Sequence, residues 1–134
     1  MYKFAEELIP VDGAKENYYK LWINGECLID GFWDKIEKEG NYIDDLDKAQ
    51  NIIERKSRRE IVPDTSFKEL TGRKKSDTIK DYEIRVKKIR IYLFKCEKVG
   101  KMIVLGALKD DKKQKADIEY MRRIKKAYIK SKTL

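Results

Sequence analysis

The clearest alternation of hydrophobic and polar positions in this chain lies in residues 82–93, YEIRVKKIRIYL. Two short alternating runs flank the pair Lys87 and Lys88, and this pattern predicts an antiparallel hairpin with its turn at the lysines. The predicted hairpin has one apolar and one polar face. The apolar face carries Tyr82, Ile84, Val86, Ile89, Ile91 and Leu93, and the polar face carries Glu83, Arg85, Arg90 and Tyr92.

A symmetric turn places Arg85 directly opposite Arg90 in this hairpin. Like charges opposite each other on neighbouring strands repel, at a cost of roughly 0.2–1 kcal/mol. A bound phosphate would offset the repulsion, and so would the nearby carboxylate of Glu83. The sequence leaves both interpretations open, one functional and the other structural.

Periodic patterns on either side of the hairpin predict the other elements. Residues 18–23 have the composition of a strand, and Asn24–Gly25 is a strong turn signal after them. Met102–Leu108 is a continuous apolar run that predicts a central strand, in which Gly106 indicates that another group approaches closely. Apolar residues at helical spacing predict three helices. These cover Cys27–Glu39, about Ile43–Arg59 and about Ala116–Lys130, and a further turn is expected at Glu97–Gly100.

These elements define a fold class and a domain boundary. Residues 1–17 are predicted to be a loosely ordered lead-in, and residues 18–134 to form a single domain. The order β-α-α-β-β-β-α predicts an α+β fold. We expect a small antiparallel sheet with the two N-terminal helices packed on one face.

Composition narrows the possible chemistry. The chain has 134 residues and no histidine, which excludes a Ser-His-Asp or Cys-His nucleophile. Two cysteines without histidine cannot make a structural zinc site. We expect no cofactor. The chain has no secretory signal and no apolar run near the length of a membrane span, which predicts a reduced, cytoplasmic protein without membrane contact.

Charge is divided unevenly along the chain. The net charge is +8, with six Lys/Arg against 13 Asp/Glu in residues 1–54, and 26 against 11 in residues 55–134. This segregation indicates a polyanionic partner for the second half, nucleic acid first. A lysine-rich surface that only keeps the protein soluble is the alternative.

Several motifs stand in an order that resembles the RelE/HigB superfamily of bacterial toxins, in particular its phage-derived, HigB-like branch. They are Leu70-Thr71-Gly72 before the hairpin, the strands Tyr82–Arg85 and Ile89–Tyr92, and the apolar strand Ile103–Leu108 running into Lys109. The likeness covers about residues 18–130 in topology and residues 67–115 in motifs.

The resemblance implies a RelE-like fold and a toxin-like mRNA interferase. Such an enzyme is a metal-independent endoribonuclease, commonly acting on mRNA in the ribosome and inhibited by a cognate antitoxin, here expected to be a helix-turn-helix protein. By position, Arg85 and Arg90 would clamp the scissile phosphate, Lys109 would be the third cation, and Tyr92 or Glu83 would transfer protons. The flanking nucleic-acid-binding residues would be Arg73, Lys74, Lys75, Lys112 and Lys113.

The chain also departs from the family pattern. Many HigB-like toxins use histidines near the active site, and this chain has none. The alternative function is therefore a non-catalytic nucleic-acid-binding module on the same fold. The two functions share the cationic surface and differ in whether bound RNA is cut.

Overall fold

The computed structural model describes residues 1–96 and 100–132 and shows an α+β fold. Within those residues, seven strands form one mixed sheet, and three helices pack against it. None of these helices is long and apolar enough to cross a lipid bilayer. The strands are β1 (Phe4–Leu8), β2 (Tyr18–Ile23), β3 (Glu26–Cys27), β4 (Phe67–Glu69), β5 (Asp81–Val86), β6 (Ile89–Cys96) and β7 (Gly100–Leu108), and the helices are α1 (Leu28–Glu39), α2 (Ile43–Ser57) and α3 (Asp111–Lys132).

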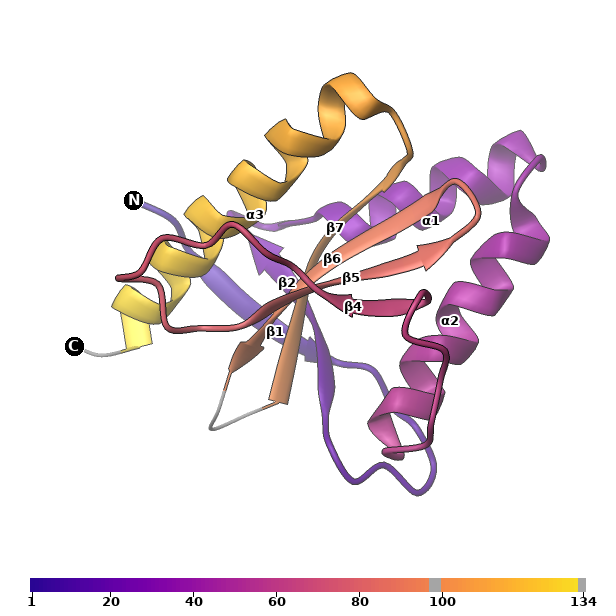
Figure 1. The fold of residues 1–134 in the computed structure, drawn as a ribbon, viewed down its shortest axis with the longest axis horizontal. Helices are drawn as coiled ribbons and strands as arrows, with labels where there is room; N and C mark the ends of the chain where they lie inside the picture. Colours follow the sequence, from indigo (N-terminus) through magenta and orange to yellow (C-terminus); the bar gives the residue numbers. More distant parts are fainter. Residues whose placement is uncertain (97–99, 133–134) are drawn as a thin grey trace.

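The helices lie on both faces of the sheet (Figure 1). Helices α1 and α2 cover one face, where Ile29, Leu46 and Ile53 pack with Ile84 and Ile91 of the hairpin. Helix α3 covers the other face, where its apolar residues pack against the neighbouring strands. That second core contains Met121, Ile124 and Tyr128 together with Tyr92, Phe94 and Val104. The two N-terminal helices therefore share one face, as the sequence pattern predicts.

The strand order across the sheet is β1-β2-β7-β6-β5-β4, with β3 paired to β2. The prediction of a purely antiparallel sheet was wrong, because β2 runs parallel to its neighbour β7. The backbone amide of Lys101 donates to the carbonyl of Asn17 at 3.0 Å where this parallel pair begins. The Lys101 ammonium is buried beside the carboxylate of Glu16, 2.5 Å away. A strand's own residues do not state which neighbour it pairs with, so composition could not reveal this direction.

The predicted hairpin is confirmed in its register. Val86 pairs with Ile89, and Arg85 pairs with Arg90, across the turn at Lys87 and Lys88. Lys87 has a φ of 52°, which closes the two-residue turn in the left-handed region. The apolar set therefore faces α1 and α2, whereas Tyr92 and Glu83 of the polar set lie on the side of α3.

Gly106 in β7 confirms the predicted close approach of another group. A Cβ atom added there would overlap Phe32 Cδ2 and lie 2.9 Å from Phe32 Cε2 and 3.0 Å from Ile29 Cδ1. Both of these residues are on α1. No side chain fits in that space, so the glycine lets α1 pack directly on the centre of the sheet.

The N-terminal lead-in contains an element that the sequence pattern did not predict. Residues 1–17 were expected to be loosely ordered, but β1 pairs with β2 over five residue pairs, from Phe4 with Ile23 to Leu8 with Tyr19. This edge strand is exposed along most of its length and has no apolar alternation, which is why the pattern missed it.

The boundaries of the other elements differ from prediction by a few residues. Helix α2 ends at Ser57 rather than Arg59, and α3 begins at Asp111 rather than near Ala116. The turn predicted at Glu97–Gly100 falls largely outside the described residues. No sequence pattern indicated β4, which is only three residues long.

Candidate nucleic-acid interface

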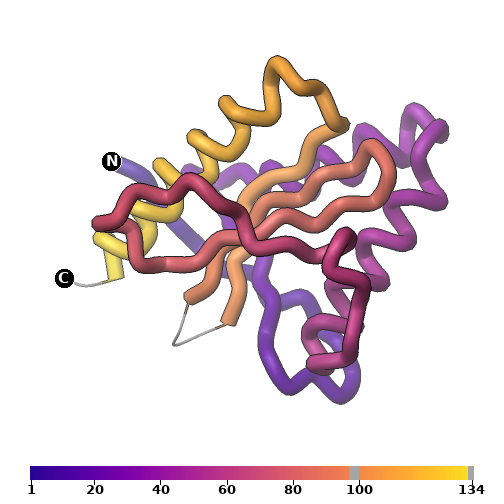
Figure 2. Tube along the Cα trace, in the orientation of Figure 1, coloured from indigo at the N-terminus to yellow at the C-terminus, as the bar shows by residue number. Residues whose placement is uncertain are grey.

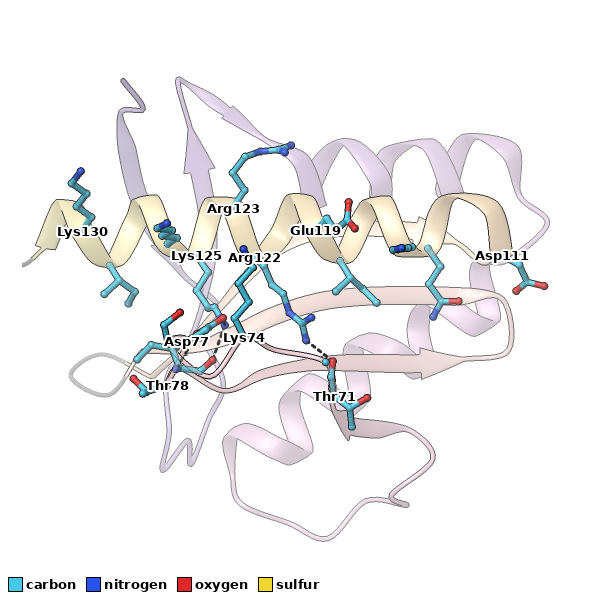
Figure 3. Close-up of a pocket in the computed structure, with 18 residues that line it drawn as sticks. Thr71, Lys74, Asp77, Thr78, Asp111, Glu119, Arg122, Arg123, Lys125 and Lys130 are labelled. Carbon is cyan, nitrogen blue, oxygen red and sulfur yellow. Dashed lines mark hydrogen bonds and ion pairs between the residues drawn. The ribbon is translucent and has the colours of Figure 1, made fainter.

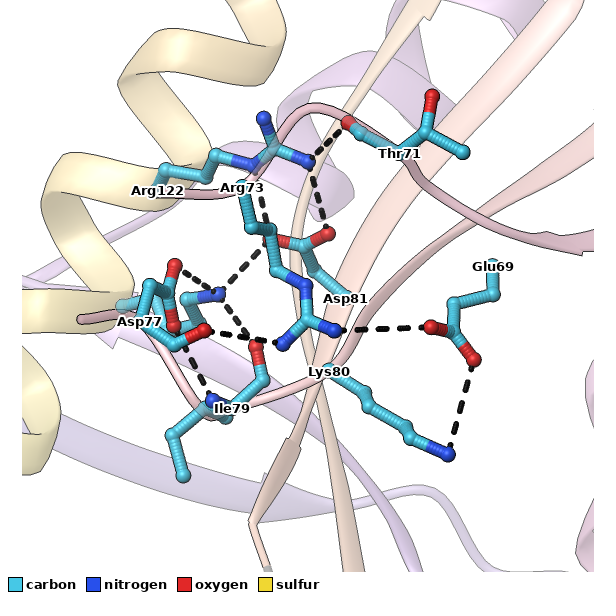
Figure 4. A network of polar contacts seen from close by, with 9 residues as sticks. Glu69, Thr71, Arg73, Asp77, Ile79, Lys80, Asp81 and Arg122 are labelled. Atoms are coloured by element: carbon cyan, nitrogen blue, oxygen red, sulfur yellow. Dashed lines mark hydrogen bonds and ion pairs between the residues drawn. The ribbon is translucent and has the colours of Figure 1, made fainter. Parts of the chain in front are cut away.

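Helix α3 is attached to the rest of the domain by buried charges. Asp81, at the start of β5, is 0% exposed, and Lys125 of α3 is 2% exposed. The Lys125 ammonium lies 2.8 Å from Asp81 Oδ2 and 2.7 Å from Asp77 Oδ2. Arg122 approaches the carboxylate of Asp81 with two nitrogens, Nε at 2.9 Å from Oδ2 and Nη2 at 3.1 Å from Oδ1. Figure 4 shows Asp77, Asp81 and Arg122 converging between α3 and the chain before β5.

The same two cations also hold the segment 70–80, which has no regular secondary structure. Arg122 Nη2 donates to the Thr71 carbonyl at 2.8 Å, and Lys125 Nζ donates to the Ile79 carbonyl at 2.6 Å. Figure 2 shows this segment leaving the sheet and running beside α3. Burying these charges is costly unless each one is paired and hydrogen-bonded, and here all are. Arg122 and Lys125 therefore have a structural role.

A groove lies between this segment and α3, with a volume of about 1320 Å³. Ile79, Ile118 and Ile129 contribute apolar surface to it, and seven of its lining residues are lysine or arginine against three that are aspartate or glutamate. Figure 3 shows that Arg123 extends from the opposite side of α3 to Arg122, away from the ion network. The exposed cations are therefore distinct from the buried pair.

The exposed cations among the groove-lining residues belong to both walls. Lys74 comes from segment 70–80, and Lys115, Arg123 and Lys126 come from α3. The guanidinium carbon of Arg123 lies 5.4 Å from the centre of the Tyr120 ring. This cation–π contact orients the Arg123 side chain without neutralising its charge. A row of exposed cations along an apolar groove suits a chain of phosphates joined by less polar groups.

The predicted flanking residues have different environments. The guanidinium of Arg73 is held by contacts within the protein, because its Nη1 donates to the Asp77 carbonyl at 3.2 Å and its Nη2 lies 3.6 Å from Glu69. The other four are exposed, two on segment 70–80 and two at the start of α3. They are Lys74, Lys75, Lys112 and Lys113. Of the five predicted residues, only Lys74 lines this groove.

The predicted catalytic arginines lie in the hairpin but are not both open to solvent. Arg85 is partly exposed, and its Nε donates to the buried carboxylate of Glu83. Arg90 is only 6% exposed, and its Nη1 donates to the carbonyls of Lys87 at 2.5 Å and Ile89 at 3.0 Å. Register brings the two arginines together, while Glu83 neutralises one of them locally. The structural interpretation therefore accounts for Arg85.

The other two predicted catalytic residues do not form an open active site with the arginines. Tyr92 is 1% exposed beneath α3, and burial followed by the charge of Glu83 raises the pKa of its hydroxyl. This keeps the phenol protonated at neutral pH. Lys109 is exposed, and its ammonium lies 3.9 Å from Asp111. Its backbone amide donates to the Lys88 carbonyl at 2.6 Å, so the end of β7 lies beside the hairpin turn.

Glu83 is a buried acid on the sheet face that α3 covers. The resemblance to the RelE/HigB superfamily suggests it, after Tyr92, for proton transfer. It is 0% exposed and accepts hydrogen bonds from Arg85 and from Gln114 Nε2, the latter at 2.9 Å. Together these contacts link the hairpin to the first turns of α3. Glu83 therefore has a structural position in this conformation.

Sequence reasoning missed the ion network formed by Asp77, Asp81, Arg122 and Lys125. One signal was present, since Lys125 occupies an inward position of α3, between the turns that carry Met121 and Tyr128. A lysine at such a position requires a buried acid, but the sequence does not say which one. In residues 1–96 and 100–132, no cluster of three histidine, cysteine, aspartate or glutamate side chains is arranged to hold a metal ion.

Comparison with protein-family models, with curated proteins and with solved structures finds no match to this chain. The likeness to the RelE/HigB superfamily therefore rests on the motifs in residues 67–115. The function has to be inferred from those motifs and from the geometry of the cationic surface.

Proposed function

We propose that the chain is a nucleic-acid-binding module that holds RNA along the exposed surface of α3, beside and over the groove between this helix and segment 70–80. The observation that carries the proposal is the division of charge on α3. Arg122 and Lys125 both pair with the buried Asp81, whereas Arg123 and Lys126, the next residues in the chain, are exposed. The exposed pair is not needed to hold the helix in place and is available for phosphates.

The size of the surface supports a polymeric partner. Helix α3 has 22 residues, which corresponds to a length of about 33 Å. Exposed lysines extend over most of that length, and Lys74 adds a cation from the facing wall. The exposed lysines on the helix include Lys112, Lys113, Lys115 and Lys126. Several phosphates can therefore be contacted at once, which makes binding strongly dependent on salt. RNA is the expected polymer because the motifs in residues 67–115 resemble an RNA-acting family.

The test measures binding of a labelled single-stranded RNA at several salt concentrations. The double variant Arg123→Gln/Lys126→Gln is compared with Lys35→Gln/Lys38→Gln on α1, which removes the same charge from exposed positions outside the groove. We expect the groove variant to bind more weakly and to reduce the slope of log K against log salt by about 1.4, at about 0.7 for each lost phosphate contact. Equal weakening in both variants, or no RNA binding by the wild type near physiological salt, about 0.15 M, would contradict the proposal.

Cleavage of bound RNA is a second candidate, and one observation favours it. Arg85 lies opposite Arg90, and the Lys109 amide bonds to Lys88, so three cationic residues come from the same end of the sheet. In such a site the ribose 2′-hydroxyl loses its proton to a base and attacks the adjacent phosphate. The P–O5′ bond breaks, the leaving 5′-oxygen takes up a proton, and the products are a 2′,3′-cyclic phosphate and a 5′-hydroxyl. The arginines stabilise the charge that develops on the phosphate. One well-placed donor of this kind contributes on the order of 2.7–4 kcal/mol. An mRNA interferase with a helix-turn-helix antitoxin is the form that the motifs suggest.

This second candidate has its own test. Wild type and Arg85→Lys are incubated with programmed ribosomes and with free RNA, and the products are examined for a 2′,3′-cyclic phosphate end. Cleavage by the wild type that falls about 100-fold in the variant would support the enzyme. Binding without any cut product from the wild type would leave the binding module as the function.

A further inference from the structure

A second hollow lies away from the α3 groove, between α2 and the turn end of the hairpin. Its volume is about 750 Å³, within the usual range for small-molecule pockets. Five cationic residues and one acid line it, and an amide and two side-chain hydroxyls complete its polar part. The residues are Lys48 and Arg55 of α2, Arg85, Lys87 and Arg90 of the hairpin, Asp47, Asn51, Thr65 and Ser66. The excess of lysine and arginine makes this hollow markedly cationic.

Two of the hairpin cations in this hollow already have acidic partners. The Lys87 ammonium lies 3.8 Å from Asp45, and Arg85 is paired with Glu83. Their charges are therefore balanced within the protein.

Arg55 of α2 is also engaged. Its Nη2 donates to the Ile61 carbonyl at 2.6 Å, and its Nε lies 3.7 Å from Glu60. These contacts hold the wall of the hollow in place. Of the five cations that line the hollow, Lys48 and Arg90 are the two for which no acidic partner is found among the described residues.

Arg90 is the most informative residue in this hollow. It is more than nine-tenths buried, and its hydrogen-bond partners are two backbone carbonyls, which accept hydrogen bonds without cancelling its charge. Within residues 1–96 and 100–132, its Nε–H has no hydrogen-bond partner, and no carboxylate lies within ion-pair distance of its guanidinium. A buried charge without a counter-ion is costly, and an anion held in the hollow would remove that cost.

We propose that this hollow binds a small phosphomonoester of the size of a nucleoside monophosphate. The guanidinium of Arg90 carries a charge that no carboxylate in the described part of the chain balances, which attracts a phosphate, and the neighbouring Lys48 adds a second charge. The hydroxyls of Thr65 and Ser66 are suitable partners for the remaining phosphate oxygens.

This site is separate from the groove of α3, because it uses different elements. It shares Arg85 and Arg90 with the cleavage candidate, but cleavage needs a polymer with two linked nucleotides, and this site needs only a phosphomonoester. Failure to bind a monophosphate, failure to bind RNA and failure to cut RNA are therefore three distinguishable outcomes.

The experiment follows the Arg90 Nε–H resonance by NMR while phosphate, adenosine monophosphate or adenosine is added at constant ionic strength. We expect saturable shifts with phosphate and with the monophosphate, about tenfold tighter binding for the monophosphate, and no shift with adenosine. Lys48→Gln should weaken phosphate binding about three- to tenfold. Lys48 is exposed and can be replaced without disturbing the core. Lys35→Gln on α1 is the matched control and should bind phosphate as the wild type does.

Two results would overturn the proposal. One is an Arg90 resonance that does not respond to any of the three probes. The other is phosphate binding that persists in Lys48→Gln but is lost in Arg123→Gln/Lys126→Gln, which would assign the anion to the α3 groove. Because Arg55 also holds the chain at Ile61, Arg55→Gln serves as a second variant only after its thermal unfolding is shown to match the wild type.

Discussion

The two faces of the sheet are covered by helices that are attached in different ways. On the face of α1 and α2, the two helices contact the sheet mainly through apolar side chains, with Ile29, Ile36 and Leu46 almost fully buried in that core. The buried ion pair on this face, Lys101 with Glu16, joins β7 to the chain before β2 and involves neither helix. On the face of α3, an apolar core is combined with buried charges, including Asp81 and Lys125. Attachment of α1 and α2 therefore depends mainly on shape and volume, and attachment of α3 depends in addition on the pairing of specific charges.

This difference separates cations that look alike in the sequence. In the run Arg122-Arg123-Ile124-Lys125-Lys126, the first and fourth residues face the network, and the second and fifth are exposed. Helical geometry places residues three apart on the same side, so the two pairs alternate between structure and surface. A count of charge therefore overstates the number of cations available to a partner.

The largest effect is expected from breaking the network on the α3 face. Asp81→Asn removes the charge that both Arg122 and Lys125 contact, while keeping the size of the side chain. We expect the free energy of unfolding to fall by about 3–5 kcal/mol, because a buried lysine loses an acidic partner. Chemical denaturation measures this, with the exposed Asp64→Asn as control, expected within about 0.5 kcal/mol of wild type. A loss below about 1 kcal/mol would show that the network is not what holds α3.

The apolar face is tested by a change of volume without any change of charge. Gly106→Ala places a methyl group against the ring of Phe32, 2.9 Å from Cε2, so α1 or the ring must move. We expect a loss of about 1–3 kcal/mol in the free energy of unfolding. Gly31→Ala is the matched control on α1, where an added Cβ meets no atom within 4 Å. That control should raise stability by about 0.5–1 kcal/mol, and a loss there equal to the loss at Gly106 would count against the packing argument.

A smaller, pH-dependent effect is expected where β1 meets the end of α3. Partial burial alone raises the pKa of Glu6, but the hydrogen bond from Tyr128 and the ammonium of Lys132 outweigh it and hold the pKa below its ordinary value. The stabilisation is therefore present above the unfolded pKa, about 4.3, and is lost as pH falls through the folded value. Glu6→Gln should lose about 0.5–1 kcal/mol at pH 7, and the difference from wild type should shrink toward about pH 3. Denaturation at several pH values measures it, and a constant difference would refute this assignment.

The hairpin was predictable to the residue, whereas the site around it was not. Alternation fixes which residues of β5 and β6 share a face, and a two-residue turn fixes their register, so Arg85 opposite Arg90 followed from the sequence alone. The exposure of these side chains did not follow from the sequence, because it depends on α3. This helix begins at Asp111 and covers Tyr92 and Glu83 only in the folded protein.

The ion network of Asp77, Asp81, Arg122 and Lys125 shows the same limit of sequence reasoning. Lys125 stands out at an inward position of α3, but Asp81 is 44 residues away in the chain. Local periodicity reports which side of a helix is buried and does not report what it is buried against. The missing partner was therefore beyond any pattern within α3.

The amino-acid sequence by itself determined the hairpin, its register, the two-helix face and the close packing at Gly106, because each depends on local periodicity or on the size of one side chain. Only the tertiary structure decided that β2 runs parallel to β7, that Arg90 and Tyr92 are buried, and which cations of α3 are exposed. Those outcomes depend on contacts between segments far apart in the chain, and such contacts leave no periodic trace in either segment.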